Sequence, residues 1–231
     1  MGYSNSYLVA YTLLSPNHSG LRTEQIDRIS PHCVVGQCTA EGLGDWFHKS
    51  STQASSNYGI DRNGRVGLYV EEKNRSWCTS SNANDQRAVT IECASDKVEP
   101  YAMHQVVYDR LIDLCEDICR RNGKKKLLWF GDKNKSLNYQ PKADEMLITV
   151  HRWFANKSCP GDWLYARLGD LAAKVTSRLG SGNVEVIPSG MQAGEFQGLT
   201  EEQVLAKVGP LFTADQKKSG ILASVSMAQF I

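Results

Sequence analysis

The sequence lacks a net charge of either sign and any long basic stretch. Its 26 Lys and Arg residues nearly balance 25 Asp and Glu residues, which leaves a formal charge of +1 over 231 residues. Proteins that bind nucleic acid usually carry a basic stripe. The one basic run, residues 124–126, is better explained as a solvated connection between a helix and a strand. We therefore expect no nucleic-acid partner.

Signals for secretion and for membrane insertion are also missing. No apolar stretch is long enough to span a bilayer. The first 14 residues lack the basic start, apolar centre and small-residue cleavage site of a secretory signal. We expect a protein that is made in a cytoplasm without a signal peptide and that does not insert into a membrane.

The seven cysteines are an odd number and lack the regular spacing of a disulfide framework. A chain of this length can bury a core without disulfides, so we expect synthesis in a reducing compartment. Cys115 and Cys119 are spaced i,i+4 beside Leu111, Leu114 and Ile118. This spacing favours core packing on one helix over a redox pair, because free cysteine behaves as a small hydrophobe.

Apolar periodicity predicts alternating strands and helices. A hydrophobic fraction of 41% is typical of a globular protein, and Asn63-Gly64 is a strong hairpin turn signal. The predicted fold class is α/β, with a central mixed β-sheet flanked by helices. Strands are expected at residues 8–14, 26–35, 88–94 and 126–130 and in a hairpin at 57–77, and helices at 39–49, 101–122 and 160–179.

Three details of this pattern concern burial and position. Residues 8–14 have the composition of a buried strand. The helix after Thr39 is expected to bury Leu43, Trp46 and Phe47 on one face. Pro31 removes a hydrogen-bond donor from its strand, so His32 is expected at a bulge or a strand end, where it can be aimed into a cleft.

The chain is expected to divide into a domain and an appendage. Residues 1–179 have the size and pattern of one domain. Residues 180–198 are rich in Gly, Ser and small polar residues, which predicts a linker. A capping box at Thr200 to Gln203 opens a helical segment, residues 199–231, whose pattern stops without an end signal, as expected for a chain cut from a longer one.

Three side chains form a candidate metal site. His32, His151 and Cys159 offer the imidazole nitrogens and the thiolate that zinc prefers, and a three-ligand site leaves a fourth position for water. Lys157 would bring a cation to the same rim, where it can stabilise charge on a substrate oxygen. Glu92, a carboxylate within an apolar strand, is the candidate general base.

Other arrangements of these groups stay open at this stage. Each of these residues is more often structural when taken alone. An imidazole could instead activate the Cys159 thiol, which would make a cysteine hydrolase with His151 as its base. Cys33 adjoins His32, but neighbouring strand residues face opposite sides of a sheet, so both are not expected to bind one ion. The remaining histidines are expected in solvent, at positions 18, 48 and 104.

Several motifs resemble, in order, the zinc-dependent N-acetylmuramoyl-L-alanine amidases of phage endolysins, which are relatives of the peptidoglycan recognition proteins. The resemblance covers residues 1–179. The motifs are Ile-Ser-Pro-His32-Cys, Ser-Ser-Asn-Tyr58-Gly-Ile-Asp-Arg-Asn-Gly, Val-Thr-Ile-Glu92-Cys, His151-Arg-Trp-Phe and Lys157-Ser-Cys159-Pro-Gly.

This resemblance implies a substrate and a role for each residue. The substrate is peptidoglycan, and the bond cut joins N-acetylmuramic acid to L-alanine. His32, His151 and Cys159 would bind Zn²⁺, Glu92 would act as general base and Lys157 would stabilise the oxyanion. Some members have a tyrosine near the metal. Here the matching stretch, residues 55–58, places serine there, and Tyr58 is expected to face the core.

The resemblance also implies a biological setting. An endolysin is made in the host cytoplasm and acts on the bacterial cell wall after release. Residues 198–231 resemble the opening of an endo-β-N-acetylglucosaminidase domain, but the chain ends before the catalytic glutamate of that family, so no glycosidase activity is expected. A peptidoglycan-binding module without turnover is the alternative from a different functional class.

Overall fold

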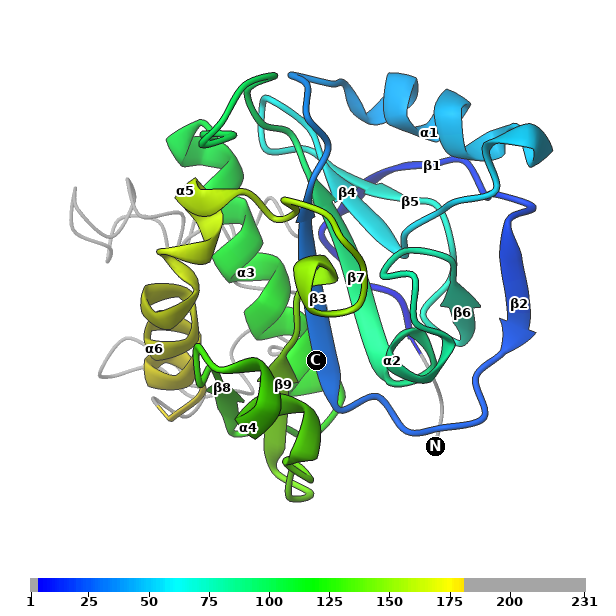
Figure 1. Ribbon diagram of the computed structural model, residues 1–231. Helices are drawn as coiled ribbons and strands as arrows, with labels where there is room; N and C mark the ends of the chain where they lie inside the picture. The colour runs from blue at the N-terminus through cyan, green and yellow to red at the C-terminus, as the bar shows by residue number, and fades with distance from the viewer. Residues whose placement is uncertain (1–3, 181–231) are drawn as a thin grey trace, which may run out of the picture. The chain divides into compact units, whose positions relative to one another are not determined.

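The computed structural model describes residues 4–180 (Figure 1). The described residues belong to one compact unit. The expected linker and the expected helical segment therefore lie outside the described residues, apart from Gly180, which ends the last described helix. None of the helices within residues 4–180 combines the length and the apolarity needed to cross a bilayer.

A mixed seven-stranded sheet forms the centre of the described unit. Only β4 and β5 pair antiparallel, and the other neighbours in this sheet run parallel. The strands, in order across the sheet, are β1 (Val9–Thr12), β5 (Val66–Leu68), β4 (Tyr58–Ile60), β7 (Ala88–Cys93), β3 (Arg28–Cys33), β9 (Glu145–Ile148) and β8 (Lys126–Leu128). The predicted fold class is confirmed. A separate two-stranded ribbon pairs β2 (His18–Leu21) with β6 (Asn74–Ser76).

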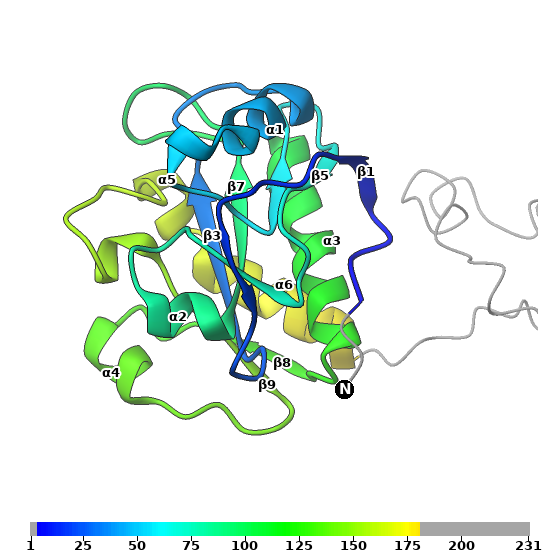
Figure 2. The ribbon, with the colours of Figure 1, turned by 90° about the vertical axis from the view of Figure 1, so that its right-hand side faces the viewer.

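The helices cover two different faces of this sheet (Figure 2). On β4, Tyr58 and Ile60 belong to the main hydrophobic core with the residues of α3 (Gln105–Arg121) and α6 (Leu168–Gly180). Gly59 between them faces the other way, since a Cβ at Gly59 would lie 2.6 Å from Leu43 of α1 (Ala40–His48). Side chains level with Gly59 therefore lie on the face opposite α3 and α6.

The main core follows the predicted apolar stripe of α3. The side chains of α3 that face the sheet are completely buried. They are Val107, Leu111, Leu114, Cys115 and Ile118. Burying one such aliphatic side chain stabilises the fold by roughly 1.5–3 kcal/mol. Cys115 and Cys119 are buried free thiols, as predicted. Gly123 follows the helix with φ of 67°, a left-handed conformation that favours glycine at this end.

Three expectations about these elements are wrong in detail. β1 alternates between half-buried and exposed residues, because it lies at the sheet edge and pairs with β5 alone. On α1, Leu43 and Phe47 are buried but Trp46 is 57% exposed, because the covered stripe is narrow. The predicted last helix is broken into α5 (Asp162–Tyr165) and α6.

The remaining elements are short and connect the strands. They are the helix α2 (Asn82–Arg87), the helix α4 (Lys133–Asn138) and two 3-10 turns, η1 (Ser50–Thr52) and η2 (His151–Trp153). Ser81 caps α2 by accepting a hydrogen bond from the Asn84 amide. Asn84 of α2 donates to Ser30 of β3 and accepts from Thr149, which follows β9, so α2 lies against these two strands.

Candidate metal centre

His32 lies one residue before the end of β3. Pairing of β3 with β7 is continuous from Arg28 to Cys33, so the expected bulge is absent and the expected strand end is confirmed. Pairing of β3 with β9 covers only Arg28 and Ile29. Pro31 lies beyond that second ladder, so its missing N–H interrupts no pairing with β9.

Glu92 on β7 is the direct partner of His32 in the parallel register, and Gly59 is the partner of Glu92 on the other side. All three residues therefore face the side of the sheet away from α3. His32 Nδ1 and Glu92 Oε1 are 3.8 Å apart, and the Glu92 side chain is only 17% exposed. The predicted ligand and the predicted base are thus adjacent.

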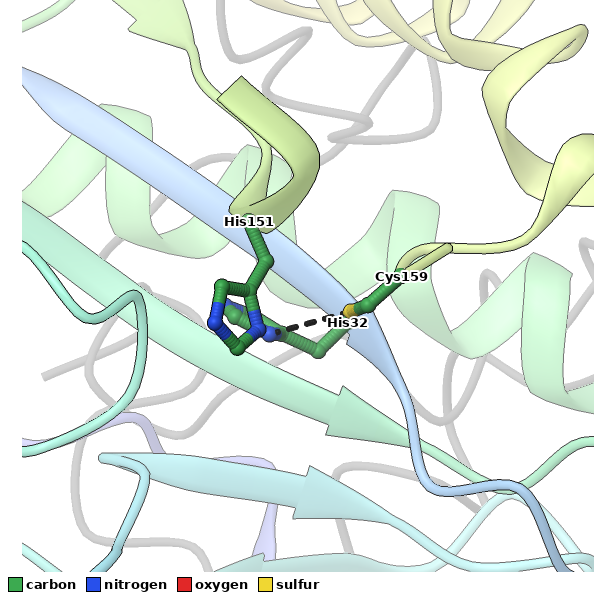
Figure 3. A group of neighbouring side chains, drawn as sticks. All are labelled: His32, His151 and Cys159. Carbon is green, nitrogen blue, oxygen red and sulfur yellow. Dashed lines mark hydrogen bonds between the residues drawn. The ribbon is translucent and has the colours of Figure 1, made fainter. Parts of the chain in front are cut away.

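His151 reaches the same point because β9 runs parallel to β3. The Thr149 amide donates to the Ile29 carbonyl, and the chain then leaves the sheet into η2 at the end where His32 lies. The His32 and His151 ring centroids are 5.2 Å apart. Figure 3 shows His151 and Cys159 approaching His32 from the segment that passes over β3.

Cys159 is brought back to His151 by a closed loop. The Arg152 amide donates to the Cys159 carbonyl at 3.1 Å, and the Arg152 guanidinium donates to the Ser158 carbonyl. The Cys159 Sγ atom lies 3.2 Å from His32 Nδ1 (Figure 3). Arg152 thus stabilises the loop between His151 and Cys159 through two hydrogen bonds. The sequence around Arg152 did not predict this role.

The three predicted ligands fit a metal ion. One ligand atom from each of His32, His151 and Cys159 lies within 4.8 Å of the other two. Tetrahedral zinc with bonds of about 2.0–2.3 Å separates its ligand atoms by roughly 3.3–3.8 Å. The three ligand atoms therefore need to move only slightly toward one another to bind zinc. His32 Nε2 and Glu92 Oε2 are buried and have no hydrogen-bond partner within residues 4–180, which marks this site as one built for a further group.

Burial sets the protonation states at this site. It lowers the pKa of His32 to about 3, with a smaller contribution from His151. Burial also lowers the pKa of His151, and the nearby Lys157 charge adds to this. Both imidazoles are therefore neutral, which is the form that binds a metal. For Glu92, burial raises the pKa to about 7.

The Cys159 thiol has its pKa raised well above the usual value by contact with Cys33, by burial and by the Glu92 charge. A thiol in such surroundings stays protonated unless a cation is bound beside it. Cys33 itself belongs to no candidate ligand group among the described residues. The thiol chemistry therefore suits a metal ligand better than a free nucleophile.

Two polar neighbours were missed by sequence reasoning. The Cys78 thiol lies 3.8 Å from Glu92 Oε1 and forms a second candidate ligand group with His32 and Glu92. Ser80 Oγ lies 3.0 Å from His151 Nε2. Asp85 holds their loop by accepting hydrogen bonds from the amides of Cys78 and Thr79. No periodicity predicts such contacts, since they depend on how one loop closes over another.

A groove of about 420 Å³ opens beside the site and is lined in part by Cys78, His151 and Lys157. Lys157 is exposed, so its ammonium can meet a ligand in this groove. Tyr58 lies elsewhere: it is fully buried and donates its hydroxyl to Glu72, which confirms that it faces the core. The histidines at positions 18, 48 and 104 belong to no candidate ligand group among the described residues.

A family model described as N-acetylmuramoyl-L-alanine amidase matches residues 22–162, more than half of the chain. The chain belongs to the N-acetylmuramoyl-L-alanine amidase family. Membership of this amidase family supports hydrolysis of peptidoglycan at an amide bond. All five predicted site residues lie inside the matched segment.

Several solved structures are similar to this chain. N-acetylmuramoyl-L-alanine amidase LysC from Clostridium intestinale URNW is 17% identical, with a TM-score of 0.47 over 72% of this chain and 94% of that one. A Se-Met AmpD derivative is 16% identical, with a TM-score of 0.48 over 74% and 99%. PlyL is 14% identical, with a TM-score of 0.46 over 75% and 98%. At these values the neighbours add nothing to the family match, and no curated protein matches the chain.

Proposed function

We propose that this amidase uses a zinc ion, held by His32, His151 and Cys159, to hydrolyse the bond between N-acetylmuramic acid and L-alanine. One observation carries the proposal. Two neutral imidazoles and a thiol from β3, η2 and the following loop converge within 4.8 Å, beside the largely buried carboxylate of Glu92. Such a donor set is typical of zinc with an open fourth position.

Two residues beside the proposed ligands, Glu92 and Lys157, would carry out proton transfer and charge stabilisation. A bound zinc supplies a Lewis acid and lowers the pKa of water toward neutrality. Glu92, with a pKa of about 7, accepts the proton of the attacking water and passes it to the departing amide nitrogen. Lys157 on the groove wall offers positive charge to the carbonyl oxygen as that oxygen becomes negative.

A cysteine hydrolase is less well supported. A nucleophilic cysteine needs a lowered pKa, whereas contact with Cys33, burial and the Glu92 charge all raise the pKa of Cys159. The Cys159 thiol also meets His32, whose own pKa is about 3, so this imidazole is a poor base for a thiol. Metal binding requires a neutral His32 imidazole, which its low pKa provides, and a Cys159 thiolate, which a bound cation would stabilise.

The wider role proposed is that of a phage or prophage endolysin, which is made in the host cytoplasm and lyses the cell from its wall. Residues 1–179 would form the amidase domain, residues 180–198 a linker, and residues 199–231 the incomplete start of a glucosaminidase-like domain. The partner would be a glycan strand with its stem peptide. No glycosidase activity is proposed for residues 199–231.

The chemistry of the products tests this function. Purified peptidoglycan is incubated with the protein, and free N-terminal L-alanine and new reducing ends are both measured. The proposal expects new L-alanine amino groups and no new reducing ends. Binding to the wall without released amino groups would favour a binding module and would contradict the proposal.

A further inference from the structure

The groove beside the candidate metal centre has a second cationic residue. Arg75 on β6 lines the same groove as Lys157 and His151, and Trp77 lies two residues further on. The volume of about 420 Å³ is within the usual range of roughly 300–1,000 Å³ for small-molecule sites. A short peptide attached to the reacting bond can therefore contact both cations.

The guanidinium of Arg75 is oriented by neutral oxygens. Nη1 donates to Asn82 Oδ1 at 2.5 Å, and Nη2 donates to Ser19 Oγ, which also accepts from Trp77 Nε1 at 2.6 Å. No carboxylate forms an ion pair with Arg75 among residues 4–180, and its Nε atom has no partner there. The positive charge is thus held in place without a direct ion pair, although it lies near enough to Asp85 to oppose the rise that burial causes in the pKa of that carboxyl.

The carboxylate that lines this groove is committed elsewhere. Asp85 is only 2% exposed and accepts hydrogen bonds from the Cys78 amide and from both the amide and the hydroxyl of Thr79. These contacts hold the loop that carries Ser80 to His151. Asp85 therefore takes up none of the donors of Arg75. Nε is buried, but Nη1 and Nη2 each make one hydrogen bond, so each keeps a second N–H group for a carboxylate on a ligand.

The substrate carries such a carboxylate close to the bond that is cut. In peptidoglycan, L-alanine is followed by a D-glutamate joined through its side chain, so the main-chain carboxyl of this residue is either free or amidated. One extended residue spans about 3.5 Å, which places this group on the order of 7 Å from the reacting amide. Planar guanidinium binds carboxylate in a paired geometry that a neutral amide cannot match.

We propose that Arg75 binds the free carboxylate of the second stem residue and makes this amidase prefer D-isoglutamate over D-isoglutamine at that position. This inference rests on the proposed function, because it takes the groove as the site of the stem peptide. Lys157 stabilises charge on the reacting carbonyl oxygen, whereas Arg75 binds the stem residue that follows L-alanine.

Two synthetic substrates test the proposal. N-acetylmuramoyl-L-alanyl-D-isoglutamate and its isoglutamine counterpart, each with the side-chain carboxyl blocked as a methylamide, differ only in this carboxylate. The kcat/KM of the native protein should favour the acid about tenfold, as expected for a charge-assisted hydrogen bond. Arg75→Gln should bring the ratio close to one, and Arg75→Lys should leave a part of it. Arg178→Gln, on the opposite face, is the matched control and should keep the native ratio.

Binding gives a second readout that does not need turnover. In the Glu92→Gln background, calorimetric titration with the same two compounds should show a similar preference for the acid, lost when Arg75→Gln is added. A merely structural Arg75 would lower binding of both compounds equally, which overturns the proposal, as does a native ratio near one. Failure of the native protein to cleave either compound, with preferential binding of the acid retained, would instead reject the proposed hydrolysis.

Discussion

His32 and Glu92 occupy paired positions on adjacent parallel strands, with Nδ1 and Oε1 3.8 Å apart. Backbone hydrogen bonds between β3 and β7 therefore fix the distance between a proposed ligand and the proposed base. Burial acts on both groups, lowering the pKa of His32 to about 3 and raising the pKa of Glu92 to about 7. At this paired position, His32 is a neutral imidazole and Glu92 is a carboxyl that can gain or lose its proton near neutral pH.

Replacing Glu92 should separate catalysis from metal binding. Glu92→Gln keeps the size of the side chain but removes the base, so kcat should fall at least ~100-fold, the usual contribution of a positioned general base. Zinc content by elemental analysis should stay near one ion per chain. Glu41→Gln, an exposed carboxylate in a surface ion pair, is the control and should keep the native rate. Native turnover in Glu92→Gln would remove it from the mechanism.

Ser80 should act on zinc affinity through His151. Its hydroxyl contacts His151 Nε2 at 3.0 Å, which orients the ring and leaves Nδ1 for a metal. Ser80→Ala should weaken zinc binding by about tenfold or more, because partners of ligating histidines typically have effects of that size. The measurement is competition of the apoprotein with a chromophoric chelator, and equal affinities for the alanine variant and the native protein would contradict this role.

The metal-free protein should lose stability in mild acid because of His32. The pKa of His32 is about 3 in the fold against 6.5 when exposed, so its stabilising contribution is complete above pH 6.5 and is lost as pH falls toward 3. The unfolding free energy of the native protein should therefore fall about 1.4 kcal/mol per pH unit more steeply than that of His32→Gln. Urea unfolding at pH 6 and pH 4 gives both slopes. Parallel slopes would show that His32 is not buried as described.

A buried ion pair should stabilise the domain without taking part in catalysis. Glu72 pairs with Arg121 through two contacts of 2.6 and 2.9 Å and accepts from the Tyr58 hydroxyl at 2.7 Å. Glu72→Gln should cost about 2–4 kcal/mol of unfolding free energy, since it leaves a buried guanidinium partly unpaired. Asp170→Asn, which breaks an exposed pair with Lys174, should cost less than about 1 kcal/mol. Similar losses in the two variants would contradict the burial of this pair.

The sequence predicted those parts of the fold that depend on local periodicity. The stripe of α3 is continuous, so that helix was predicted nearly in full, and the hairpin followed from Asn63-Gly64. Trp46 was misplaced because the width of the covered stripe on α1 depends on the sheet beneath it. The edge position of β1 likewise depends on strand order, which periodicity does not encode.

Only part of the candidate site could be predicted, because periodicity does not encode contacts between distant segments. His32 and Glu92 stood out because a histidine and a carboxylate are unusual in buried strands. Ser80 and Arg75 did not, since a serine and an arginine in polar segments carry no signal until loop closure places them beside His151 and in the groove. Tertiary contacts between loops thus decide which ordinary polar residues surround the proposed ligands.

Hydrolysis should depend on a zinc ion held by His32, His151 and Cys159, and following metal content and activity in one sample tests this dependence. The protein is exhaustively chelated, its zinc is measured, and release of N-terminal L-alanine from purified walls is assayed before and after zinc is restored. We predict loss of both zinc and activity on chelation and recovery of both at one zinc ion per chain. Full hydrolysis by the metal-free protein would show that zinc is not needed for the reaction.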